Sequence, residues 1–485
     1  MTLWYEVSNN VASGVVVTMA VDDNLFVGPN VMVVSDDGHY GVSAPAGQIN
    51  SAQIYGSIYG SNGLYAGDGA NFIHVGVGGS VSGSSYGMHI YGSSSHISNE
   101  GNISGSTAID FVAAGNVVSN SGTISSNYNS GIYMVGGVNQ VVNSGTIMAS
   151  YSNAIYISSV SLDSTNTIDN SGTIASSVGY SAIYTGDAAA NVTNSGHIIG
   201  GIFFGNGNNF YDGTLGSVTG TVTAGTGTND FSGGAGKETF DLSYGTDTVD
   251  GGGGNDTFVV GANFAHVSID GGNGTDTVTL NGATTLVFTP TTMVNVEKLT
   301  LKAGYNYTLT THDTTVAAGQ TLTVDGSALS VSSALTFNGA AETNGHFVII
   351  GGKGADKLTG GALPDTFVYS SAAQSTSTHY DTITGFNFGS DIFDTPGAAG
   401  TITGINTTVT GGTLSTASFD ANLTTAVTGH LTAHHAILFK PNAGTLSGAT
   451  FLVVDLNGTA GYQTGADLVI RLNGSSGAFA AGGFH

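Results

Sequence analysis

Four nine-residue segments combine glycine turns with one acidic residue at a fixed place. Three of them, GGGGNDTFV at 251–259, GGNGTDTVT at 271–279 and GGKGADKLT at 351–359, follow the pattern GGxGxDxUx, where U is a hydrophobic residue. A fourth, GGALPDTFV at 360–368, is degenerate because Leu363 replaces a turn glycine. Glycine turns present backbone carbonyls where a Cβ would obstruct them, and the aspartate adds charge. This oxygen-rich set suits a hard cation, and the pattern is typical of calcium-binding parallel β-helices.

Shorter acidic segments at 225–231, 233–240 and 245–250 extend the same series toward the N-terminus. With two nonapeptides in each coil, residues about eighteen positions apart lie on the same side. We expect Glu238, Asp256 and Asp276 on one side of the first block, Asp230 and Asp247 on its other side, and Asp356 and Asp365 on opposite sides of the second block. The candidate calcium ligands are these acidic residues together with Gly251, Gly253, Gly271, Gly274, Gly351 and Gly354. The alternative interpretation is an acidic, solvated turn without a metal.

A different repeat fills the first half of the chain. NSGTI occurs at 120–124, 143–147 and 170–174, with NEGNI at 99–103 and NSGHI at 194–198. This near-constant spacing, with short alternating β segments between Gly, Ser and Asn, predicts a stacked β-solenoid with one coil per repeat. Equivalent residues then form ladders about 4.8 Å apart, so each Asn can hydrogen-bond its counterparts. We expect Asn and Gly to supply a left-handed corner and Ile to point inward.

A second strand follows each Asn by about a dozen residues, as in GIYM at 131–134, AIYI at 154–157 and AIYT at 182–185. Alternation places the Ile and Met residues in the core and turns the intervening residues outward. The outward residues are Tyr65, His89, Asp110, Tyr133, Tyr156, Tyr184 and Phe203. Tyr133, Tyr156 and Tyr184 are therefore a candidate assembly or glycan-contacting surface. Simple stacking that stiffens one face is the alternative.

Composition excludes several other classes. The 485 residues contain 77 Gly, no Cys, 32 acidic residues and only 7 Lys plus Arg, giving a net charge of −25. A nucleic-acid partner is not expected at this charge, and no disulfide can form. We also expect no membrane-spanning segment, because no stretch approaches the roughly 18 apolar residues that a helix needs. MTLWYEVSNN lacks the basic and apolar regions of a secretory leader, so no cleaved N-terminal signal peptide is expected.

The nonapeptides resemble those of RTX (repeats-in-toxin) proteins, which bacterial type I systems secrete. FVYSSAAQSTSTHYDTITGFNFGSDIFD at 367–394 resembles the segment after the repeats in serralysin-type C-terminal domains, with Asp381, Asp391 and Asp394 at the acidic positions. NVEKLTL at 295–301 and FLVVDLNGTAGYQTGADLVIRLNG at 451–474 resemble modules of RTX surface-layer proteins. The resemblance covers roughly 225–485 and implies calcium binding, a C-terminal uncleaved export signal, and an extracellular or cell-surface location.

The first half of the chain offers little for catalysis. No HExxH motif occurs, the GxSxG context of a lipase is missing, and residues 1–236 contain neither Lys nor Arg. A β-helix polysaccharide lyase or epimerase must neutralise a uronate carboxylate and remove a proton. His74, His89, His96 and His197 remain possible for that work, but isolated His residues on strands or turns are usually structural or merely exposed, so we expect no enzyme. The leading hypothesis is a secreted protein that self-assembles with calcium into a surface layer or filament. The alternatives are an adhesin or biofilm-matrix protein that binds a cell-surface polysaccharide and, third, the lyase or epimerase.

The predicted fold class is all-β: a parallel β-helix or β-solenoid followed by a calcium-binding β-roll and a C-terminal β cap. Six regions are expected, namely an N-terminal β entry or assembly region at 1–60, solenoid repeats at 61–222, the first RTX block at 223–280, a linking β-solenoid at 281–350, a second RTX block at 351–395, and the cap with its secretion signal at 396–485.

Overall fold

The structure is a computed structural model that describes residues 4–7, 9–20, 23–44, 49, 51–159, 164–177, 179–395 and 402–485. Strands account for 47% of the residues and helices for 5%, and the parallel strands form a β-solenoid. The predicted all-β solenoid class is therefore confirmed. The chain divides into two compact units, Met1–Gly254 and Asn255–His485. The six-region organisation stays a prediction.

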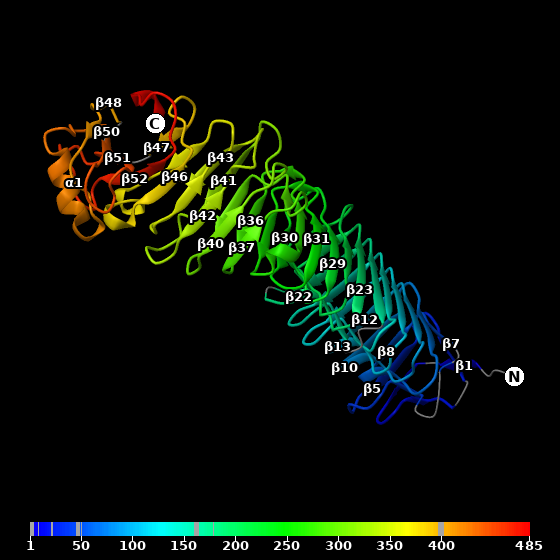
Figure 1. The fold of residues 1–485 in the computed structure, drawn as a ribbon. Helices are drawn as coiled ribbons and strands as arrows, with labels where there is room; N and C mark the ends of the chain where they lie inside the picture. The colour runs from blue at the N-terminus through cyan, green and yellow to red at the C-terminus, as the bar shows by residue number, and fades with distance from the viewer. Residues whose placement is uncertain are drawn as a thin grey trace. The chain divides into compact units, whose positions relative to one another are not determined.

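Most coils of the first unit contain three short strands, the coils of β8 (Ser57–Ala66) and β10 (Ser80–Ile90) have one long strand in place of two, and equivalent strands of successive coils pair in parallel (Figure 1). The first face consists of β1 (Trp4–Val7), β4 (Asn24–Val27), β7 (Ser51–Ile54), β9 (Phe72–Val75), β11 (His96–Asn99), β14 (Val117–Asn120), β17 (Gln140–Asn143), β20 (Thr165–Asn170), β23 (Ala189–Asn194), β26 (Phe210–Asp212), β29 (Thr228–Ser232) and β31 (Thr246–Asp250). The second and third faces consist of β2 (Asn10–Ala12), β3 (Val17–Thr18), β5 (Met32–Ser35), β6 (Val42–Ala44), β8 (Ser57–Ala66), β10 (Ser80–Ile90), β12 (Asn102–Gly105), β13 (Thr107–Phe111), β15 (Thr123–Ser126), β16 (Ile132–Val135), β18 (Thr146–Ala149), β19 (Ile155–Ser158), β21 (Thr173–Ser176), β22 (Ser181–Thr185), β24 (His197–Ile199), β25 (Gly201–Phe203), β27 (Ser217–Val218), β28 (Thr221–Thr223) and β30 (Thr239–Leu242). A short strand, β32 (Gly253–Gly254), ends the unit.

The core of this unit is the inside of the coils. Ile124, Ile147 and Ile174, which follow the NSG corners, are completely buried. The alternate residues of the following strand, such as Ile132, Met134 and Ile155, are buried as well. Burying an Ile side chain contributes about 1.5–3 kcal/mol, so the inward rows are the main apolar stabilisation of each coil. The predicted inward positions are confirmed.

A ladder of asparagines, here called the corner ladder, runs along the first face. It consists of Asn99, Asn120, Asn143, Asn170 and Asn194, each at the end of its strand and at most 3% exposed. The Nδ2 of each residue donates to Oδ1 of the next at 2.7–2.8 Å. An amide can donate and accept at once, so the ladder partners its members along the stack. The hydrogen bonding predicted for the repeated Asn is confirmed.

The reason for glycine at the corner differs from the prediction. Among the described residues, the glycines with left-handed φ do not include Gly122, Gly145, Gly172 or Gly196 of the NSG corners. A Cβ on Gly122 would instead overlap the carbonyl oxygen of Gly101, and one on Gly145 would overlap that of Gly122. The expected left-handed corner is thus wrong. Glycine is needed there because the backbones of adjacent coils approach too closely for a side chain.

The second unit continues with parallel strands and ends in a mixed module (Figure 1). Its solenoid elements are β33 (Thr257–Val260), η1 (Phe264–His266), β34 (Val267–Asp270), β35 (Asn273–Gly274), β36 (Thr277–Leu280), β37 (Thr284–Val287), β38 (Met293–Val294), β39 (Lys298–Leu301), β40 (Tyr307–Thr310), β41 (Thr321–Asp325), β42 (Leu335–Asn338), β43 (His346–Ile350), β44 (Lys357–Thr359), β45 (Thr366–Val368), η2 (Ala372–Gln374), η3 (Ser377–His379), β46 (Asp381–Thr384) and β47 (Ile392–Asp394). The C-terminal elements are β48 (Gly404–Ile405), β49 (Val409–Thr410), η4 (Thr416–Ser418), α1 (Phe419–Val427), β50 (His435–Lys440), β51 (Thr450–Val454), β52 (Leu468–Asn473) and η5 (Ala481–Gly483).

The C-terminal module extends one sheet of the solenoid. Strand β52 pairs in parallel with β46, and β51 and β50 follow it antiparallel. Helix α1 packs on this sheet through Phe419, Leu423 and Val427, which share a buried cluster with Phe451. The chain end joins the stack too, because Phe484 stacks on Phe393 at 5.6 Å between ring centroids.

We predict that Asn143→Ala lowers the free energy of unfolding by about 2 kcal/mol, because it removes one rung and leaves buried amide groups of Asn120 and Asn170 without that partner. Asn127→Ala, at an exposed position of the same region, is the matched control and should change it by less than about 0.5 kcal/mol. Urea denaturation measures both. Equal midpoints for the two variants would contradict the ladder's contribution.

Candidate metal centre

The nonapeptide aspartates of the second unit stack on one another. The Oδ1 of Asp276 accepts the backbone N–H of Asp256 at 2.7 Å, and the Oε2 of Glu297 accepts that of Asp276 at 2.7 Å. Asp256 and Asp276 are at most 1% exposed. Three carboxylates thus follow each other at one-coil intervals, here called the first acid ladder. Sequence reasoning missed Glu297, although its separation of 21 residues from Asp276, about one coil, was visible.

The second nonapeptide block builds two more ladders on opposite sheets. Asp356 Oδ1 accepts the N–H of Leu335 at 2.7 Å, and Asp381 Oδ1 accepts the N–H of Asp356 at 2.8 Å. On the other sheet, Asp365 Oδ1 accepts the N–H of Phe347 at 2.8 Å. The fourth acid, Asp391, accepts the N–H of Asp365 at 3.2 Å. Asp356 and Asp365 therefore lie on opposite sides, as expected, and each has a second carboxylate in the next coil.

In the first unit, side-chain amide oxygens accept most of the backbone N–H groups that carboxylates accept in the second unit. Oδ1 of Asn139 accepts the N–H of Asn116, Oδ1 of Asn166 accepts that of Asn139, and Oδ1 of Asn229 accepts that of Asn209, at 3.0–3.2 Å. We call this series the entry ladder. At its end the Nδ2 of Asn229 donates to Asp247 Oδ1 at 2.7 Å. The acid ladders therefore repeat a structural amide motif with carboxylates in its place.

The three acidic candidates of the first unit, Asp230, Asp247 and Glu238, lie in different settings. Asp230 is exposed and lies opposite Thr248, whereas Asn229 lies opposite Asp247. The expected pairing of Asp230 with Asp247 is therefore wrong by one residue, which in a strand reverses the face. Glu238 is 3% exposed, and its Oε2 accepts the N–H of Gly234 at 3.3 Å.

The glycines make room for the carboxylates. A Cβ on Gly351 would overlap Asp356 Oδ2, one on Gly360 would overlap Asp365 Oδ2, and one on Gly271 would lie 2.9 Å from Asp276 Oδ2. Gly274 has φ +149°, but Gly251, Gly253 and Gly354 are outside the left-handed region. Gly351 and Gly354 are buried, Gly253 is half-buried and Gly251 is buried. The first glycine of a nonapeptide thus forms one wall of the cradle that holds its own aspartate.

Several buried carboxylate oxygens have no hydrogen-bond donor. The Oδ2 atoms of Asp247, Asp276 and Asp356 are buried without a partner. Burial raises the pKa of Asp247 to about 7 and that of Asp356 to about 7. Burial also raises the pKa of Asp381, which the carboxylate of Asp356 raises further. The ionised state of these groups therefore needs a compensating positive charge.

Calcium fits the chemistry of this donor set. Among the described residues, no three His, Cys, Asp or Glu side chains gather as a metal cluster. A cation at an acid ladder would therefore use one or two carboxylates and complete its shell with backbone carbonyls and water, which calcium accepts with six to eight oxygens. The unpartnered oxygens of Asp276 and Asp356 and the glycine walls beside them supply such a place.

The predicted aromatic stripe exists on the outer surface of the first unit. Tyr133, Tyr156, Tyr184 and Phe203, here called the aromatic stack, have centroids 4.7–5.3 Å apart and nearly parallel rings. Tyr65 and His89 form a separate stack at 5.8 Å, and Asp110 interrupts the row. Asp110 is paired with His89 at 2.9 Å between Oδ2 and Nδ1. Stacking at the coil spacing stabilises this face, whatever else it contacts.

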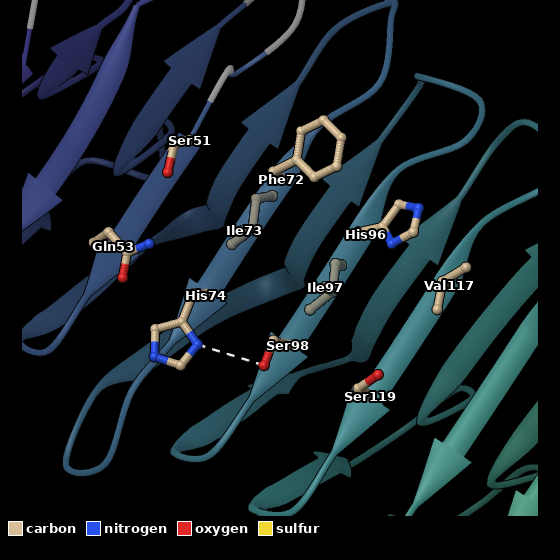
Figure 2. A pocket seen from close by; sticks show the side chains of 10 residues that line it. All are labelled: Ser51, Gln53, Phe72, Ile73, His74, His96, Ile97, Ser98, Val117 and Ser119. Carbon is tan, nitrogen blue, oxygen red and sulfur yellow. Dashed lines mark hydrogen bonds between the residues drawn. The ribbon is translucent and has the colours of Figure 1, made fainter.

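The histidines considered for catalysis lie in different settings. His74 and His96 line a depression of about 210 Å³ on β7, β9, β11 and β14, whose other walls are Ser, Gln, Phe, Ile and Val side chains (Figure 2). Figure 2 shows His74 hydrogen-bonded to Ser98, at 3.4 Å, and Phe72 beside His96. His197 Nδ1 lies 2.9 Å from Ser217 Oγ. The lining of this depression contains no acid and no basic Lys or Arg.

Comparisons with protein-family models and with curated proteins returned no match for this chain. Within the described residues, no helix has the length and apolar character needed to span a membrane.

We predict that the calcium-free protein loses stability as the pH rises. The folded-state pKa values of about 7 for Asp247 and Asp356 and about 6 for Asp365 lie above the ordinary value of 3.8. The folded state therefore holds more protons than the unfolded state above pH 4, and this stability is lost as the pH rises through 6 to 7. Urea midpoints in calcium-free buffer at pH 5 and pH 8 test this.

The Asp356→Asn variant should show a smaller fall between the two pH values, because the amide does not titrate. Asp230→Asn, at an exposed position, is the control and should keep the full fall. A fall that is unchanged in Asp356→Asn would assign the pH dependence to other groups.

Proposed function

We propose that this protein is a secreted structural protein that self-assembles into a surface layer or filament outside the cell, with calcium as the trigger. The observation that carries the proposal is the combination of acid ladders in the second unit with an open sheet edge in the first. The RTX-like nonapeptides support export by a type I system with an uncleaved C-terminal signal. No catalytic role is proposed.

The acid ladders support the calcium trigger. Carboxylates at one-coil spacing repel one another: beyond the effect of burial, the charge of Glu297 raises the pKa of Asp276 and that of Asp356 raises the pKa of Asp381. Extracellular calcium sites bind at roughly 10⁻⁴ to 10⁻³ M. Inside a cell, where calcium is scarce, the ladders would stay repulsive and the chain would remain unfolded enough for export. Outside the cell, calcium would bind the carboxylates of the acid ladders and remove this repulsion.

The open edge supports assembly. Among the described residues, strand β1 is the edge strand of the first face and pairs with β4, while β2 pairs with β5 in the neighbouring sheet. Val11 in β2 is 62% exposed and Met32 in β5 is 50% exposed. An exposed strand edge with apolar side chains is a template for another chain. A second copy of this chain is the occupant that we propose, because its strands carry the same coil pattern.

We predict that Val11→Lys abolishes calcium-dependent polymers, because a lysine on a strand edge opposes strand addition. Negative-stain microscopy in calcium and in chelator is the measurement, and deletion of residues 1–35 should give the same loss. Val77→Lys is the matched control, because Val77 is 76% exposed in the turn between β9 and β10. Regular polymers from both Val11→Lys and the truncated chain would place the contact elsewhere.

Circular dichroism of the same samples tests the trigger separately. The wild-type chain should gain β structure on addition of millimolar calcium. Asp256→Asn with Asp276→Asn replaces two carboxylates by amides, as in the entry ladder, and should reduce the calcium needed. Spectra unchanged by calcium would overturn the trigger without deciding the assembly.

A second candidate, a glycan-binding adhesin or matrix protein, is favoured by one groove of the first unit. It has a volume of about 430 Å³ and is lined by Tyr86, Thr107, Asp110, Asn129, Ser130, Tyr133, Ser152, Asn153 and Tyr156. Aromatic rings beside hydroxyl, amide and carboxylate groups can stack on a sugar and hydrogen-bond its hydroxyls. The groove adjoins the aromatic stack, so a polysaccharide could continue along it.

For this candidate we predict that Tyr156→Ala lowers polysaccharide binding at least tenfold, because the ring lines the groove and belongs to the stack. Binding is measured on immobilised bacterial surface polysaccharides. Tyr244→Ala is the control, because Tyr244 is 65% exposed and lies outside the stack. Equal binding by Tyr156→Ala and the wild-type chain would remove the groove from consideration.

A further inference from the structure

The C-terminal module contains a pair of acidic residues that belongs to none of the nonapeptides. Strands β51 and β52 form an antiparallel hairpin whose last pair is Val454 with Leu468. Asp455 and Asp467 directly follow and precede these residues, so they face each other at the mouth of loop 455–467. Both are completely buried. Like charges directly opposite each other in an antiparallel pair are destabilising unless something compensates them.

Backbone N–H groups donate to three of the four carboxylate oxygens of Asp455 and Asp467. Gly458 N–H donates to Asp455 Oδ1 at 2.6 Å. Gln463 N–H donates to Asp467 Oδ2 at 2.6 Å and Leu456 N–H to its Oδ1 at 3.3 Å. The Oδ2 of Asp455 is buried without a hydrogen-bond partner. A fixed, fully buried carboxylate oxygen without a donor, opposite a second carboxylate, is a ligand position for a cation.

Protein side chains do not supply the missing charge. The ion pairs of the described residues include neither Asp455 nor Asp467. The imidazole of His434 lies beside Gly458 and makes no ion pair within the described residues. Burial, with the charge of Asp455, raises the pKa of Asp467 to about 7. A shared proton or a bound cation are the two ways to compensate such a pair.

We propose that loop 455–467 binds one calcium ion through the carboxylates of Asp455 and Asp467. The loop is rich in other oxygen atoms, including the side-chain amides of Asn457 and Gln463, and calcium accepts amide, carbonyl and water oxygens beside one or two carboxylates. Binding joins the two ends of the loop, and it requires both carboxylates ionised. This site lies outside the nonapeptides and does not depend on the proposed assembly.

Calcium here would organise the whole C-terminal module, because the loop contacts most of its parts. Tyr462 Oη donates to Asp420 Oδ1 of α1 at 2.8 Å, and Gly461 N–H donates to the carbonyl of Leu431 at 2.9 Å. Gly465 N–H donates to Thr376 Oγ1, beside η3, at 3.1 Å. A loop loosened by carboxylate repulsion would weaken all three contacts. The module that carries the expected export signal would then gain its final packing only where calcium is abundant.

Hydrogen exchange of the full chain, followed by mass spectrometry of peptides within 455–467, tests the site. With 10 mM calcium at pH 7.5 we expect exchange about tenfold slower than in chelator, as a Kd of about 1 mM implies. Asp455→Asn should remove this calcium response, because the amide lacks the charge but keeps the shape. The double variant Asp256→Asn with Asp276→Asn should retain it, which separates this loop from the nonapeptides.

Three results would overturn the proposal: no calcium response in the wild-type loop, a response that persists in Asp455→Asn, or one that disappears in the nonapeptide double variant. A fourth would replace calcium by a proton. In that case the calcium-free loop would be protected at pH 5 as well as at pH 7.5 with calcium, after correction for intrinsic exchange, and calcium at pH 7.5 would have no effect. Asp467→Asn provides a second variant if Asp455→Asn does not fold.

Discussion

The difference between an amide and a carboxylate governs this structure, because every coil places the same atoms one strand spacing above the last. An amide donates and accepts, so Asn120, Asn143 and Asn170 of the corner ladder each donate to one neighbour and accept from the other. A carboxylate only accepts. In the entry ladder an Asn oxygen accepts a backbone N–H, and at Asp276 and Asp356 a carboxylate oxygen accepts it instead, which leaves a second oxygen and a charge over. The exchange of an amide for a carboxylate thus leaves buried charge in the second unit that no hydrogen-bond donor compensates at Asp276 and Asp356.

The two units differ in which of these side chains stabilise them. The first is stabilised mainly by amide ladders, inward isoleucines and stacked aromatic rings, which do not titrate near neutrality, although it also contains Asp247, whose pKa burial raises to about 7. The second contains the acid ladders and the paired acids Asp455 and Asp467, which are buried, so their ionised forms need a compensating charge. The glycines beside the acids make room for the carboxylates, since any side chain at Gly351 would overlap that of Asp356.

The sequence was sufficient for the features that repeat. The period of NSGTI predicted the coils, their inward Ile residues and the aromatic row, because stacked repeats expose the same pattern many times. It was insufficient where a shift of one residue reverses the face of a strand. Asp230 was therefore grouped with Asp247, although the residue opposite Asp247 is Asn229. It also misjudged the corner glycines, since close contact between neighbouring backbones is invisible in a single repeat. Glu297 was missed because it stands outside a nonapeptide, and the pairing of Asp455 with Asp467 depends on a hairpin register.

The direction of the hydrogen bonds has a mechanical consequence. In the first unit the bonds between coils, such as those from β14 to β17 and from β17 to β20, run along the stacking direction. A pulling force in that direction acts on all interfaces in series, so coils detach one after another instead of shearing together. Each freed repeat of about 24 residues releases roughly 80 Å of chain. A tether built in this way yields gradually under tension and dissipates energy at each step.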